Sequence, residues 1–148
     1  MQTVHYIRTS SFLLIAIIPI SVIGYLLAVD YEDLFYLYEW ALSVLIAGAG
    51  GMALTGAVQM NGRIRWVQLS VLAFCVHFSV LGLFLGPFTI YPMFGVYYLV
   101  TVLALLVYVY TLFKVKQYRS VPVLLMVGSS LMTFYMMFLH MLWGANLT

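Results

Sequence analysis

Long apolar stretches alternate with short polar or turn-forming segments along the whole chain. Each apolar stretch reaches the roughly 20 residues that an α-helix needs to cross about 30 Å of hydrocarbon. The apolar positions are continuous, whereas the strands of a membrane β-barrel would alternate apolar and polar residues and be about half as long. The pattern therefore predicts an all-α integral membrane protein with five transmembrane helices, at about residues 11–29, 40–60, 66–86, 94–113 and 121–143.

The segments between these stretches are too short to form a second folded unit. We therefore expect residues 1–148 to form a single transmembrane helical domain. The principal alternative has four spanning helices and one re-entrant or interfacial segment. It is disfavoured because it would place Arg63 and Lys114 on opposite sides of the membrane.

Charged residues are sorted along the chain by sign. Loops rich in Lys and Arg stay on the cytoplasmic side during insertion, whereas acidic residues have little orienting effect. In the five-helix arrangement all the basic residues share one side, which predicts an N-terminus inside and a C-terminus outside. These basic residues are Arg8, Arg63, Arg65, Lys114, Lys116 and Arg119.

Composition agrees with a bilayer as the surroundings of the chain. Hydrophobic residues make up 66% of the sequence and charged residues 7%, against about 25% charged residues in an ordinary soluble domain. So much apolar surface must face lipid or partner subunits rather than water. A net charge of +2 without a run of basic residues makes nucleic acid an unsuitable partner. We expect a multi-pass protein, in the cytoplasmic membrane if the source is bacterial.

Small residues recur four apart in the second apolar stretch. This spacing lets two helix backbones approach closely in lipid, where close packing replaces the hydrophobic drive that water supplies. The stripes can bind another membrane protein or a second copy, or they can fill the centre of this bundle. The second interpretation is favoured, because five helices of one chain already need a crowded centre. The two stripes are Ala47, Gly51 and Thr55, and Ala49, Ala53 and Ala57.

His77 lies close to the middle of the third stretch. An ionisable group at that depth is costly, so it should face protein or a water-filled pocket rather than acyl chains. The structural interpretation is a neutral imidazole bonded to a helix carbonyl or to Ser129, Ser130 or Thr133; the functional one is binding of a substrate or cofactor. Cys75 and His77 are two residues apart and point to different faces of a helix, so no metal site is predicted there.

His140, in the fifth stretch, is the second candidate for substrate or cofactor binding. A haem held between His77 and His140 would need both residues at nearly the same depth. Counted from Trp66 and from Val121, where their helices begin, the two histidines differ in depth by about 12 Å, at about 1.5 Å of rise per residue. An intrachain bis-histidine haem is therefore disfavoured, and no cofactor is predicted.

The carboxylates are confined to the first polar segment. No acid and base can therefore flank a buried substrate, and no serine has the sequence context of a nucleophile, so an enzyme is not favoured. The aromatic surroundings of the carboxylates suit an outer docking loop. These residues are Asp30, Glu32, Asp33 and Glu39.

These patterns favour a non-catalytic membrane subunit that packs with other membrane proteins or with itself and supports the assembly or stability of a complex. A small transporter or channel subunit for a neutral or lipid-like substrate is the alternative. A redox subunit that binds a cofactor through His77 or His140 is a weaker one.

Overall fold

The chain folds almost entirely into helices. The computed structural model describes residues 2–145, with side chains from 5 to 143. A short 3-10 turn, η1 (Glu32–Leu34), separates the second and third helices. The helices are α1 (Gln2–Ile15), α2 (Ile17–Asp30), α3 (Phe35–Gln59), α4 (Arg65–Leu85), α5 (Pro92–Lys114) and α6 (Ser120–Ala145).

In the described part of the chain, five helical stretches are long and apolar enough to cross a membrane. The six helices make five such stretches because α1 and α2 together form the first one. This agrees with the number of spans that the hydrophobic pattern predicts. The helices extend beyond the apolar stretches: α1 begins at Gln2, and α3 begins at Phe35 rather than near residue 40. Hydropathy marks only the apolar part of a helix, whereas backbone hydrogen bonding continues into the flanking polar residues.

The first span is interrupted at Ala16, between α1 and α2. Pro19 lies three residues further along the chain. Proline has no backbone N–H to donate, and its ring presses against the carbonyl four residues earlier, which is that of Ile15. The last residue of α1 is therefore the one whose carbonyl loses its helical partner.

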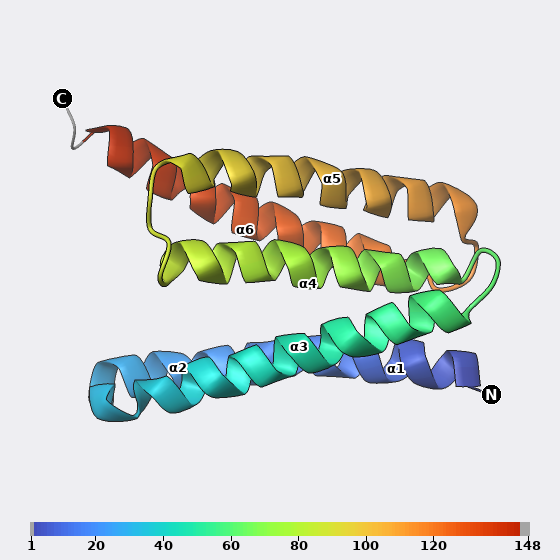
Figure 1. Ribbon diagram of the computed structural model, residues 1–148, viewed down its shortest axis with the longest axis horizontal. Coiled ribbons are helices and arrows are strands. Elements are labelled where there is room, and N and C mark those ends of the chain that lie inside the picture. Colours follow the sequence, from blue (N-terminus) through green and yellow to red (C-terminus); the bar gives the residue numbers. More distant parts are fainter. Residues whose placement is uncertain (1, 146–148) are drawn as a thin grey trace.

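The helices form two groups that meet along α3 and α4 (Figure 1). In one group α1 and α2 pack on α3; in the other α4, α5 and α6 pack on one another. Figure 1 shows α3 and α4 close together near their connecting loop and diverging toward their other ends. The loops after α3 and after α5 lie at the same end as the N-terminus, whereas the turn between α2 and α3 lies at the opposite end. The basic and acidic segments are thus at opposite ends of the bundle.

Among residues 5–143, whose side chains are described, the buried apolar residues form three clusters along the bundle. The central cluster joins α3 to the second group through Ala49, Ala53, Val71 and Tyr108. A second cluster lies between α4, α5 and α6 near the start of α5, and a third lies near the loop after α3. Many large apolar side chains outside these clusters are exposed, as expected where the solvent is lipid.

Gly24 permits the close approach of α2 to α3. A Cβ at this position would lie 2.5 Å from the ring of Tyr38, closer than two carbon atoms that are not bonded to each other can approach. Tyr38 therefore covers the backbone of α2, which holds the two arms of the first helical hairpin together.

Candidate functional site

His77 lies inside the group formed by α4, α5 and α6, and none of its surface is exposed. Its Nδ1 lies 3.1 Å from Ser129 Oγ on α6, and its Nε2 lies 2.9 Å from Thr101 Oγ1 on α5. The ring also packs on Tyr97, with 4.8 Å between the centroids. His77 is therefore surrounded by protein rather than by acyl chains, as its position in the sequence predicts, and Ser129 is one of its expected partners.

The hydrogen bonds around His77 extend across the three helices. Tyr108 Oη lies 3.0 Å from Ser129 Oγ, so the chain of polar groups runs from α5 through α6 and α4 back to α5. Thr101 Oγ1 donates to the carbonyl of Tyr97, at 2.9 Å, and can therefore accept from His77 Nε2–H at the same time. A buried network of this kind links the helices that carry its members.

Both ring nitrogens of His77 already have hydroxyl partners. Ligation of a metal or haem iron by this residue would first require one of these hydrogen bonds to break. The geometry accounts for His77 as a polar link between helices. Binding of a substrate or cofactor by His77 stays a prediction.

Thr101 is the partner of His77 that we did not expect from the sequence. The sequence signal is a series of small or hydroxyl-bearing residues on α5 with alternating spacings of four and three, which groups Thr101 on one helix face without naming its partner. These positions are Tyr97, Thr101, Ala104, Tyr108 and Thr111. The spacing places all of them on one helix face, directed at α4 and α6.

His140 belongs to a separate aromatic cluster near the start of α5. Its ring stacks on Phe94, with 4.3 Å between centroids and 15° between planes. Nδ1 lies 3.2 Å from Tyr98 Oη, and Nε2 lies 3.4 Å from Tyr91 Oη. The structure thus gives His77 and His140 different hydrogen-bond partners and does not bring them together.

The two small-residue stripes of α3 have different surroundings. Ala53 is fully buried, and its stripe partners Ala49 and Ala57 are buried with it, so this stripe packs inside the bundle. Gly51 is exposed, and a Cβ there would meet no atom within 4 Å. Its stripe partners Ala47 and Thr55 are also exposed. Only one stripe is therefore used by the helices of this chain.

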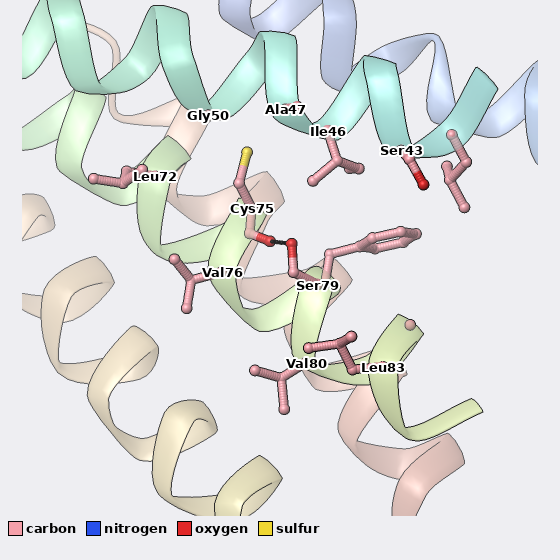
Figure 2. Close-up of a pocket in the computed structure, with 13 residues that line it drawn as sticks. Ser43, Ile46, Ala47, Gly50, Leu72, Cys75, Val76, Ser79, Val80 and Leu83 are labelled. Carbon is pink, nitrogen blue, oxygen red and sulfur yellow. Dashed lines mark hydrogen bonds between the residues drawn. The ribbon is translucent and has the colours of Figure 1, made fainter. Parts of the chain in front are cut away.

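An apolar groove of about 520 Å³ lies beside the exposed stripe, where α3 and α4 diverge (Figure 2). Ala47 and Gly50 line it from α3, and Cys75 and Ser79 line it from α4. Ser79 Oγ donates to the carbonyl of Cys75 on its own helix, at 2.7 Å, so its one donor is already used. Figure 2 shows the Cys75 side chain directed toward α3 at Gly50. The groove suits apolar surfaces.

The predicted outer loop is shorter than the sequence suggests. Asp30 ends α2, Glu32 and Asp33 lie in η1, and Glu39 is already within α3. All four carboxylates are exposed. Their role as a docking surface stays a prediction.

Among the described residues no group of three or more His, Cys, Asp or Glu side chains could hold a metal ion. The candidate site is the exposed face of α3 together with the adjoining groove. We find no family model, no curated protein and no solved structure that matches this chain.

Proposed function

We propose that the chain is a non-catalytic membrane subunit that binds a transmembrane helix, of a partner protein or of a second copy, through the exposed face of α3. The observation that supports this proposal is the open space at Gly51, on a stripe whose neighbours Ala47 and Thr55 are also exposed. Small residues allow a second backbone to approach closely, which is the main source of helix affinity in lipid. The chain's own helices leave this face uncovered.

The groove between α3 and α4 adds to this surface. It shares Ala47 with the exposed stripe, so one large side chain of a partner helix could enter the groove while its backbone lies on Gly51. Contact of that kind is helix packing and requires no reactive group. The proposed role is the assembly or stability of a membrane complex.

Replacing Gly51 with leucine is expected to abolish association, because the new side chain would hold the partner backbone away from α3. Gly95→Leu is the matched control, since a Cβ at Gly95 on α5 also meets no atom within 4 Å. Association is measured by crosslinking and co-purification from native membranes, with helicity and yield checked for both variants. If a folded, abundant Gly51→Leu variant retains its partners as well as Gly95→Leu does, the proposed face is wrong.

The proposed orientation places the N-terminus inside and the basic ends of the helices in the cytoplasm. In a Cys75→Ala background, a cysteine at Glu32 should react with an impermeant thiol reagent added outside, and a cysteine at Lys116 should not. Both positions are exposed at opposite ends of the bundle, so access is limited by the membrane alone. If the reagent labels Lys116→Cys and fails to label Glu32→Cys, the proposed orientation is wrong.

Binding of a neutral or lipid-like molecule is the second candidate function, and the apolar lining of the groove favours it. An acyl chain and a partner side chain would compete for the same space. Two results together would favour this second function over the first. Lipid would be retained by the purified wild-type chain and lost from the bulkier Gly50→Leu variant, and Gly51→Leu would leave partner binding unaffected.

A further inference from the structure

A second hollow, distinct from the groove, lies near the end of α6 close to the start of α5. Its volume is about 300 Å³, and it is lined by Tyr98, Met137, His140 and Met141. Positions 137, 140 and 141 are spaced three and four residues apart, which places all three side chains on one face of the helix. Two thioethers and one imidazole therefore converge on one hollow.

The imidazole of His140 is oriented by its neighbours. Phe94 stacks on one face of the ring. Tyr98 Oη lies 3.2 Å from Nδ1, and Tyr91 Oη lies 3.4 Å from Nε2. Tyr98 lines the hollow and Tyr91 does not, so Nδ1 is the nitrogen on the side of the hollow. When Nε2–H donates to Tyr91, the tautomer is fixed and the Nδ1 lone pair accepts from the Tyr98 hydroxyl, which lies at the hollow. A hydrogen bond at the other ring nitrogen is how protein imidazoles are oriented for metal binding.

We propose that Met137, His140 and Met141 form a binding site for cuprous copper. Thioether sulfur is a soft donor that selects Cu(I), and imidazole also suits copper. All three donors are neutral, so the occupied site carries a single positive charge, which costs less near lipid than the double charge of a divalent ion. None of the four carboxylates lines the hollow, and a hard cation would find no oxygen anion there.

In the proposed five-span arrangement the hollow lies within the last span, toward its outer end. His140 and Met141 lie in the last two turns of α6, near the end of the bundle that carries the acidic turn. Met137 and Met141 are 47% and 71% exposed. A metal ion could thus reach both sulfur atoms without the bundle opening, displacing only the hydroxyl of Tyr98 from Nδ1.

The site is tested by anaerobic titration of the purified full-length protein with Cu(I) against a chromophoric Cu(I) chelator. We expect one high-affinity Cu(I) per chain and no comparable binding of Zn²⁺. In the double variant Met137→Leu/Met141→Leu the affinity for Cu(I) should fall by more than about 100-fold, because two direct ligands are lost. Loss of a residue that only hydrogen-bonds a ligand typically costs about 10- to 100-fold in metal affinity. X-ray absorption of the loaded protein should show sulfur and nitrogen scatterers.

The matched control is Met126→Leu/Met132→Leu, which changes two methionines of the same helix that pack against apolar clusters instead. Methionine and leucine have similar volumes, so both double variants should stay folded, as circular dichroism would verify. The proposal is overturned if the wild-type chain fails to compete for Cu(I), or if the two double variants bind it equally well. Neither outcome depends on whether Gly51 binds a partner.

Discussion

Replacing His77 with alanine is expected to lower the free energy of unfolding by about 3 kcal/mol, from a cavity plus the loss of two hydrogen bonds. The ring is fully buried and bonds Ser129 and Thr101 on two other helices. His77→Asn retains a donor and an acceptor and should lose less. Reversible unfolding in mixed micelles, followed by circular dichroism, measures the effect.

A double-mutant cycle separates the hydrogen bond from the cavity. His77→Ala combined with Ser129→Ala should show a coupling of about 1 kcal/mol, because the two residues contact one another. Ser130→Ala is the control, since its hydroxyl is exposed and bonds only the carbonyl of Met126 on its own helix. Equal coupling of His77 to Ser129 and to Ser130 would show that the network does not link the helices as described.

Replacing Ala53 with leucine is expected to destabilise the bundle by about 3 kcal/mol, because a larger side chain has no room between packed helices. Ala53 is fully buried where α3 meets α4, in the same cluster as Val71 and Cys75. The added atoms would push the two helix groups apart along the line where they meet. Loss of the folded fraction on heating in detergent, compared with the wild-type chain, measures the effect.

Two variants of the same helix serve as controls for Ala53→Leu. Leu54→Ala changes the adjacent residue, of which 53% is exposed, and should alter stability by no more than about 0.5 kcal/mol. Gly51→Leu introduces the same side chain on the exposed stripe and should leave the isolated chain folded. If Ala53→Leu were as stable as these two, the buried stripe would not be the contact that joins the helix groups.

The two stripes of α3 have different expected roles. Substitution in the Ala53 stripe should impair folding itself, whereas substitution at Gly51 should impair only the binding of a partner. This difference follows from burial: Ala53 already contacts other helices, and Gly51 contacts none.

The sequence by itself determined the helical class, the number of helical stretches long and apolar enough to cross a membrane, and the separation of charge. Lipid offers no hydrogen-bond partners, so a long apolar segment must satisfy its own backbone as a helix, and composition alone reveals where that occurs. The same argument required His77 to be enclosed by protein, because an imidazole among acyl chains would lack partners. Local spacing also showed which residues share a helix face, including the two stripes of α3.

Only the tertiary structure decided which way each helix face points. Periodicity gives the relative positions of residues around a helix, but rotation about the axis depends on the packing of all its neighbours. For this reason the sequence could not tell that Ala53 faces inward and Gly51 outward, or that Thr101 completes the contacts of His77. The hollow at His140 likewise depends on Tyr98, a residue of another helix that only folding places beside it.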